Sequence, residues 1–303
     1  MRDGAGTDMT SRLLMAYNAR DKRAGARPRP PEDIRGSTRA TAILDHDDPL
    51  VGRLAHRVLS EATPRDALRS AHRIIAHTVR PVYSVEDRRP VSRTLRLGRG
   101  SCSQRMATLE AVARAVRVRT RVRGLLVDGT FWYPRFPHVK PFVPEQVLLA
   151  WPEFRVDGTW LPVGELFNAP GADGQYTNKG GETLFDAVAR TGITWDDDGT
   201  TTGAAPISAS APGATASTSA SAAASARACA ADGTSCDLSA HVTADLGHFD
   251  DRDELFRRHG QTLCWTARAL TEPILGRWSA GTDTDRSRRT TATPRTRASS
   301  RRA

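Results

Sequence analysis

The sequence has few cysteines and no long apolar run, and each shortage excludes a class of protein. Only four cysteines occur in 303 residues, at positions 102, 229, 236 and 264, too few for a disulfide framework in a chain of this size. No apolar run approaches the ~20 residues that a membrane-spanning helix needs, and Leu13–Met15 is far too short for the core of a signal peptide. We therefore expect a cytoplasmic protein that has no membrane partner and keeps its thiols reduced.

Lysine is also scarce, with three residues among the 44 basic ones, and this skew toward arginine is typical of a GC-rich bacterial genome. The net charge of +10 is concentrated at the two ends: residues 1–40 carry +4 and residues 281–303 carry +5. The body between them is close to neutral, which argues against a specific nucleic-acid groove. Polyanion binding through the two tails stays open as a third function, and deletion of both tails would abolish it.

Composition divides the chain into five predicted segments. The hydrophobic fraction of 39% is low and unevenly distributed, which indicates one real core with disordered additions. The predicted segments are a disordered Arg/Pro-rich arm (1–48), a core domain (49–197), an Ala/Ser/Thr/Gly-rich disordered linker (198–240), a C-terminal helical element that docks on the core (241–278) and a disordered Arg-rich tail (279–303).

Local signals predict helices before strands within the core, which is typical of an α+β fold. Thr63 and Pro64 predict the start of a helix that Pro81 ends. Apolar spacing predicts a second helix from residue 102 and strands over 118–127 and 146–154. Asp157–Gly158 predicts the turn of a hairpin whose partner strand spans 160–163. Further helices are expected over 182–190 and from Phe249 to Gly260.

Cys102 stands where a thiol could act chemically. Ser101 and Gln104 form the pattern of a capping box, which places Cys102 at the first position of a helix. Backbone N–H groups at a helix N-terminus stabilise a thiolate and lower its pKa, and they can form half of an oxyanion hole. The alternative is a small buried apolar residue that happens to begin a helix. Position alone leaves both interpretations open.

Three stretches together resemble the transglutaminase-like superfamily, whose members typically read Gly-x-Cys, then Ala-Arg-x-x-x-Gly, then His-Ala-Trp-x-Glu leading to Asp-Gly-x-Trp-x-x-Val-Asp. The matching stretches are Arg99–Gln104, Leu109–Gly124 and Leu149–Val163. The resemblance implies a papain-like α+β fold in which the helix bearing the Cys at its N-terminus packs on an antiparallel sheet. It also implies a thioester on Cys102 as intermediate, with no metal and no organic cofactor.

The sequence departs from the family at two of the three catalytic positions. The family's histidine falls on Leu149 and its aspartate falls on Gly164, and neither residue can move a proton. His138 could replace the histidine if its loop folds over the site, and Glu165 could replace the acid. Alternatively, the helix N-terminus alone could generate a thiolate that attacks an activated thioester. His138 as a plain loop residue and Glu165 as an exposed residue remain the alternatives.

Aromatic residues suggest where a substrate could bind. Trp132, Tyr133 and Phe136 belong to a stretch too aromatic for an ordinary loop, and Trp151 follows the Leu149 position. These four could line a pocket for an acyl or aromatic group. Alternatively, Trp132 and Phe136 could fill the core of the domain, and Trp151 could be a sheet-packing residue. His72 and His77 are five positions apart on one predicted helix, a spacing that does not suit a shared metal, so we interpret them as surface or packing residues.

Two functions follow from these features. The first is cysteine-dependent acyl transfer or amide hydrolysis on a peptide or small-molecule substrate. The second is an inactive transglutaminase-like protein that retains the fold as a binding or scaffold module, which the loss of the histidine and aspartate supports directly. Substitution of Cys102 separates them, because only an enzyme loses its activity while staying folded.

Overall fold

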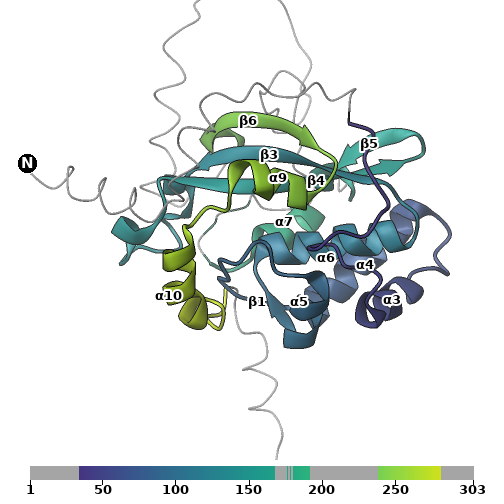
Figure 1. Ribbon diagram of the computed structural model, residues 1–303, viewed down its shortest axis with the longest axis horizontal. Coiled ribbons are helices and arrows are strands. Elements are labelled where there is room, and N and C mark those ends of the chain that lie inside the picture. Colours follow the sequence, from purple (N-terminus) through teal and green to yellow (C-terminus); the bar gives the residue numbers. More distant parts are fainter. Residues whose placement is uncertain (1–33, 168–175, 177, 179, 192–237, 281–303) are drawn as a thin grey trace, which may run out of the picture.

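The computed structural model describes residues 34–167, 176, 178, 180–191 and 238–280. A layer of helices lies beneath an antiparallel sheet, and the C-terminal helices pack along one side of both (Figure 1). The predicted α+β class is confirmed. In this part of the chain no helix has both the length and the apolar character needed to cross a bilayer.

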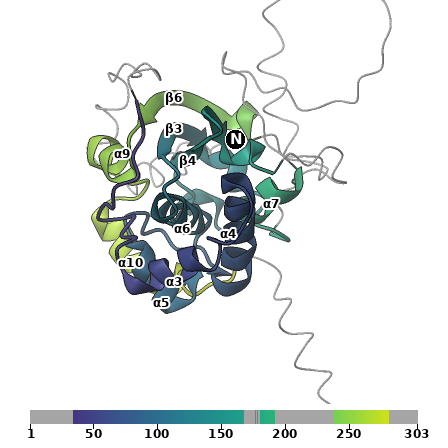
Figure 2. The ribbon, with the colours of Figure 1, turned by 90° about the vertical axis from the view of Figure 1, so that its right-hand side faces the viewer.

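The helical layer is built around α6 (Cys102–Ala115), which lies near the centre of the molecule when it is viewed end-on (Figure 2). The surrounding helices are α3 (Pro49–His56), α4 (Pro64–Thr78) and α5 (Val91–Leu97). Helix α4 begins as predicted, since the Thr63 side chain accepts a hydrogen bond from the Asp66 N–H and Pro64 occupies the first turn. Every residue of α6 from Gln104 to Arg114 is buried, so neighbours cover this helix on all sides.

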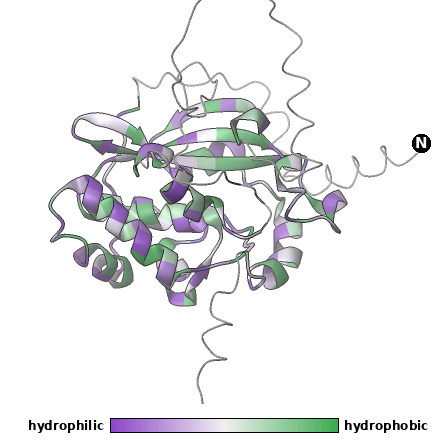
Figure 3. Cartoon of the chain, turned by 180° about the vertical axis from the view of Figure 1, so that it is seen from behind, coloured by the Kyte–Doolittle hydropathy of each residue, from purple (hydrophilic) through white to green (hydrophobic). Residues whose placement is uncertain are grey.

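The sheet has the strand order β5-β4-β3-β6, and all of its pairs are antiparallel. Its strands are β3 (Thr120–Asp128), β4 (Gln146–Val156), β5 (Thr159–Pro162) and β6 (Val242–Phe249). The predicted hairpin is confirmed: Asp157 and Gly158 both have positive φ, at 50° and 78°, as a tight two-residue turn requires. Hydrophobic and hydrophilic residues alternate along both the strands and the helices (Figure 3).

A small parallel pair joins β1 (Arg80–Pro81) to β2 (Arg99–Gly100) immediately before α6. Gly100 has to be glycine, because a Cβ atom there would lie 2.8 Å from a side-chain carbon of Thr94. This pair therefore fixes the backbone that leads into Cys102.

The described residues after 180 close the fold. They form α7 (Leu184–Thr191), β6, α9 (Arg252–His259) and α10 (Trp265–Leu275). The segment from 241 was expected to be helical, but it begins with β6, which pairs with the edge of β3. The pairing of β6 with β3 shifts register between Arg123 and Leu125, and Gly247 has a positive φ. Both features interrupt the alternation of inward and outward side chains along β6, so its sequence gives no clear strand signal. Short 3₁₀ turns lie at Gly129–Trp132, Lys140–Phe142, Val163–Glu165 and Ser239–His241.

Residues 34–48 were expected to belong to the disordered arm, but they pack against the core. Ile43 and Leu44 are fully buried, and Ser37 bridges to Thr120 at the start of β3. Asp48 accepts a hydrogen bond from the Leu50 N–H at 2.8 Å and so caps α3. Most of the predicted arm, linker and tail lies outside the described residues.

Candidate functional site

Cys102 occupies the first position of α6, as predicted. The Ser101 hydroxyl accepts the Gln104 N–H at 3.4 Å, and the Gln104 side-chain oxygen accepts the Ser101 N–H at 3.0 Å. Both halves of the capping box are therefore present. Cys102 retains part of its exposed surface and packs against the hydrophobic core.

The thiol of Cys102 is held in its neutral form. Burial raises its pKa to about 11, and the charge of Asp186 acts in the same direction. The charges of Arg105 and Arg135 and the backbone N–H of Phe185 oppose this shift without reversing it. The sequence predicted a lowered pKa from the helix N-terminus alone, but the loss of solvent around the sulfur outweighs that effect.

Helix α7 covers one side of the thiol, and an ion pair with α6 holds it there. Arg105 binds both carboxylate oxygens of Asp186, at 2.8 and 3.1 Å, and donates to the Thr183 hydroxyl. Its guanidinium also stacks over the Phe185 ring at 4.3 Å. Burial opposes ionisation of Asp186, but the hydrogen bonds from Arg105 and Thr183 and the Arg105 charge lower its pKa. Because Phe185 lies in the first turn of α7, its N–H reaches Cys102.

His72 packs beneath the same helix. Its ring stacks on Phe185 at a centroid distance of 4.1 Å and meets Phe167 edge-on at 4.7 Å. Its Nε2 lies 2.6 Å from the Phe185 carbonyl, so this nitrogen carries the donated hydrogen. Burial lowers the pKa of His72 to about 4, which keeps the imidazole neutral. His72 was expected to be a surface or a packing residue, and it is a packing residue.

The residues at the family's histidine and aspartate positions are Leu149 and Gly164, and neither carries a titratable side chain. Leu149 lies in β4 opposite Leu125 and packs against the core, and Gly164 is buried in the short turn Val163–Glu165. All eight histidines of the chain fall within the described residues, and no hydrogen bond joins any of them to Cys102. Amide hydrolysis has no hydrogen-bonded imidazole available at this thiol.

The two proposed substitutes occupy different surroundings. His138 is exposed, in the loop between Gly129–Trp132 and Lys140–Phe142. Glu165 is partly buried, and its backbone carbonyl accepts a hydrogen bond from Arg65 at 2.9 Å. Their catalytic role stays a prediction.

The aromatic residues expected at a pocket make packing contacts. Trp132 meets the buried ring of Phe131 edge-on at 4.8 Å and packs against the core. Tyr133 lies under the Lys140 ammonium at 5.6 Å, and Phe136 packs against Tyr83 at 4.8 Å. Trp151 lies in β4, away from this loop in the sequence, and is fully buried. Trp132 and Trp151 thus make the packing contacts that the alternative expected, while substrate binding by the four residues stays a prediction.

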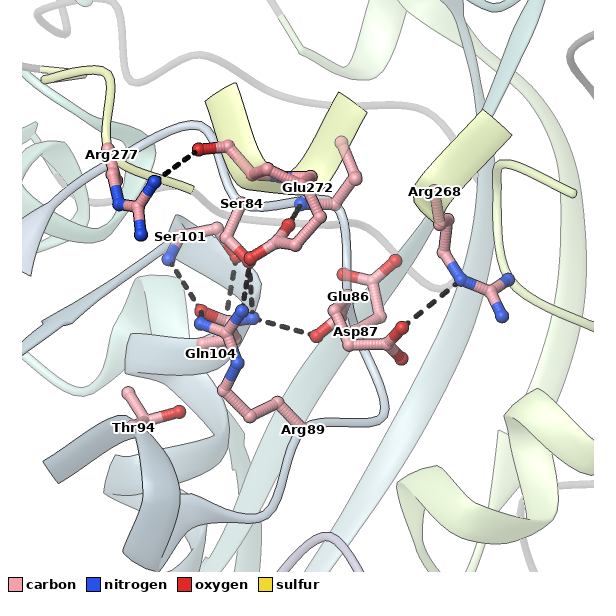
Figure 4. Close-up of polar contacts among 12 residues, drawn as sticks. Ser84, Glu86, Asp87, Arg89, Thr94, Ser101, Gln104, Arg268, Glu272 and Arg277 are labelled. Atoms are coloured by element: carbon pink, nitrogen blue, oxygen red, sulfur yellow. Dashed lines mark hydrogen bonds and ion pairs between the residues drawn. The ribbon is translucent and has the colours of Figure 1, made fainter. Parts of the chain in front are cut away.

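A polar network links the cap of α6 to α10 (Figure 4). The Gln104 amide nitrogen donates to the Ser84 hydroxyl at 2.8 Å, and its oxygen accepts from Arg89 at 3.1 Å. Ser84 and Arg89 both bind the carboxylate of Glu272 in α10, with the Ser84 contacts at 2.9 and 3.0 Å. The C-terminal helix is therefore bonded to the turn that presents Cys102. Sequence reasoning identified Gln104 as a cap but gave no signal for its distant partners.

Comparison with known proteins supports the family resemblance. Residues 52–164 match the model of the transglutaminase-like superfamily, which confirms the resemblance seen in the sequence. No curated protein matches the chain. A solved structure of a candidate protease from Parabacteroides distasonis ATCC 8503 is similar at 15% identity and a TM-score of 0.27, over 52% of this chain and 26% of that one. This chain thus aligns with about a quarter of that protein, and at this score neither its fold nor its function can be transferred.

Proposed function

We propose that the chain, whose residues 52–164 match the model of the transglutaminase-like superfamily, is a member of that family that binds a ligand without using Cys102 as a nucleophile. The observation that carries this proposal is that Leu149 in β4 and Gly164 in the turn after β5 stand at the family's histidine and aspartate positions. Burial also raises the pKa of the Cys102 thiol to about 11. At neutral pH only a small fraction of such a thiol is ionised, and the thiolate is the nucleophilic form. The ligand class is a peptide or a small molecule.

The chemistry at the two substituted positions supports the same conclusion. Hydrolysis of an amide needs a base that takes the thiol proton and an acid that returns it to the leaving amine. Leu149 and Gly164 can do neither, and the charge of Arg105 that would favour a thiolate is paired with Asp186. The fold is therefore retained while the proton-transfer groups are lost.

Acyl transfer from an activated thioester is the second candidate. It is favoured by the N–H of Phe185, which reaches Cys102 from the first turn of α7 while Cys102 begins α6. In this reaction the sulfur attacks the acyl carbon, and the carbon–sulfur bond of the donor breaks. The proton of the Cys102 thiol passes to the departing sulfur, directly or through water. Because a thiolate leaves far more readily than an amine, the missing histidine matters less than it does for an amide. His138 and Glu165 would be the substitutes for the missing pair.

An activated ester distinguishes the two candidates. We expect full-length protein mixed with p-nitrophenyl acetate at neutral pH to show no burst of p-nitrophenol beyond that of Cys102→Ser, with no acetyl group on Cys102 by peptide mass spectrometry. A stoichiometric burst that disappears in Cys102→Ser would contradict the binding proposal and support acyl transfer. His138→Ala and Glu165→Gln would then show whether either side chain assists.

A further inference from the structure

Helix α10 and the turn after it direct their apolar side away from the core. The helix lies at the edge of the molecule, below the sheet (Figure 1). Its largest apolar side chains are strongly exposed, with Trp265 at 73%, Leu270 at 76% and Ile274 at 68%. Six of the eight exposed residues between 265 and 278 are apolar and none is acidic. The six, here called the apolar face, are Trp265, Ala269, Leu270, Pro273, Ile274 and Trp278.

The inward side of α10 carries polar groups instead. Glu272 accepts hydrogen bonds from the Ser84 hydroxyl at 2.9 Å and from the Val85 N–H at 2.8 Å. Arg268 donates to the Glu86 carboxylate at 3.2 Å (Figure 4). A surface helix of a soluble domain normally turns its apolar stripe to the core, whereas α10 is held by polar bonds and presents that stripe to the outside. A contiguous exposed apolar surface of this kind marks an interaction site.

Positive charge lies at the C-terminal end of the apolar face. Arg277 is exposed beside Trp278. The Ala280 N–H donates to the Pro81 carbonyl at 3.0 Å, which places the end of this segment next to the exposed Arg80. Residues 281–303 continue from this point with seven arginines and two aspartates, a balance of +5. The partner of the apolar face should therefore combine an apolar interior with a negatively charged surface.

We propose that the apolar face of α10 inserts into the surface of a membrane that contains anionic lipids, and that the neighbouring arginines hold it there. Tryptophan is enriched at the boundary between lipid and water, and Trp265 and Trp278 stand at the two ends of the face. The sequence predicted no membrane partner because it has no spanning run, but a helix that lies flat in the membrane surface needs none. This inference goes beyond the proposed function and does not depend on the state of Cys102.

Other occupants match only part of this surface. A second copy of the chain would cover the apolar face, but it would bring together two tails that each carry +5, and like charges repel across an interface. A nucleic acid would match the arginines through its phosphates, but it would leave Leu270 and Ile274 exposed to water. An anionic membrane satisfies both the apolar face and the arginines.

Sedimentation with lipid vesicles tests the proposal on the full-length chain. We expect binding to vesicles of phosphatidylcholine that contain phosphatidylglycerol, weaker binding to phosphatidylcholine alone, and a decrease with added salt. The double variant Leu270→Ser, Ile274→Ser should bind about tenfold more weakly or less, because two large apolar side chains are lost from the contact. The matched control is Leu59→Ser, which alters an apolar residue that is 61% exposed after α3.

A chain that ends after Ala280 separates the contribution of the tail. It should bind the anionic vesicles more weakly than the parent, and its remaining binding should depend less on salt. Equal binding by the parent and by the Leu270→Ser, Ile274→Ser variant would overturn the proposal, because the arginines would then act alone. Failure of the parent to bind anionic vesicles would also overturn it, and an oligomer dissociated by the same double variant would then identify a second copy as the occupant. Both results leave the proposed function at Cys102 intact.

Discussion

At the scale of single residues, Cys102 shows how two physical effects compete at one atom. Its place at a capped helix N-terminus favours a thiolate, whereas its burial favours the neutral thiol, and burial prevails. Cys264 shows the opposite outcome at the start of α10. Burial alone would raise its pKa, but the Thr266 hydroxyl and backbone N–H groups lower it. The capping-box motif reveals the helix position of Cys102 but not the solvent around it.

His72 leads to a prediction on stability in acid. Its pKa is about 4 in the folded protein, below the ordinary 6.5, so the unfolded chain binds a proton first as the pH falls. The free energy of unfolding should therefore decrease between pH 6.5 and 4, by up to roughly 3 kcal/mol from this group. His72→Gln should flatten the curve over this interval in urea unfolding experiments. A variant with the same pH dependence as the parent would show that His72 is not buried in its neutral form.

Cys102 should affect stability at the alkaline end. The unfolded thiol ionises near its ordinary pKa, whereas the folded thiol stays neutral until about pH 11. Stability should therefore decrease as the pH rises from about 9 to 11, and Cys102→Ala should reduce this slope. Cys264→Ala serves as control, because its lowered pKa predicts no such loss. Equal slopes in the parent and Cys102→Ala would contradict the burial of the thiol.

At the scale of elements, the cap of α6 is connected to a helix more than 150 positions away in the sequence. Gln104 bonds Ser84 and Arg89, and both of these bind Glu272 of α10. The capping box itself could be predicted from Ser101 and Gln104, since it is a local pattern. The bonds to α10 could not, because they depend on how the chain returns to the core after its long polar segment.

This connection predicts energetic coupling between two helices. Gln104→Ala and Glu272→Ala should each destabilise the protein, and the double variant should be less destabilised than the sum, with a coupling of about 0.5–3 kcal/mol. Denaturant unfolding of the four proteins measures the difference. Asp245→Ala provides the control partner, because Asp245 pairs with Arg123 on the sheet, away from this network. Additive effects of Gln104→Ala and Glu272→Ala would show that the contacts do not act together.

At the scale of the whole molecule, segments from both sides of the family region enclose α6. Helices α4 and α6, strands β3 and β4 and the hairpin at Asp157 were predictable from local patterns, whereas α5 was not predicted. The strand β6 and the packing of residues 34–48 were not, because a bulged edge strand and a polar arm carry weak periodicity. The same limit applies to the site: Cys102 was identified, whereas Arg135 and Phe185 are recognised only once distant segments meet.

A buried ion pair joins the C-terminal part to the core. Arg252 of α9 binds Glu110 of α6, and both side chains have no exposed surface. Glu110→Ala leaves a buried charge without its partner and should cost about 3–5 kcal/mol of stability. The double variant Glu110→Leu, Arg252→Met removes both charges and should be markedly more stable than Glu110→Ala in thermal unfolding. A double variant no more stable than Glu110→Ala would contradict this explanation.

The measurement that tests the central claim most directly is the pH dependence of alkylation at Cys102, read by peptide mass spectrometry beside Cys264 in the same chain. A neutral, buried thiol predicts that Cys102 reacts appreciably only as the pH approaches 11, while Cys264 reacts at lower pH than an ordinary thiol. An apparent pKa of Cys102 below the free-thiol value of ~8.5 would show an activated sulfur. That result would contradict the binding proposal and restore acyl transfer as the leading function.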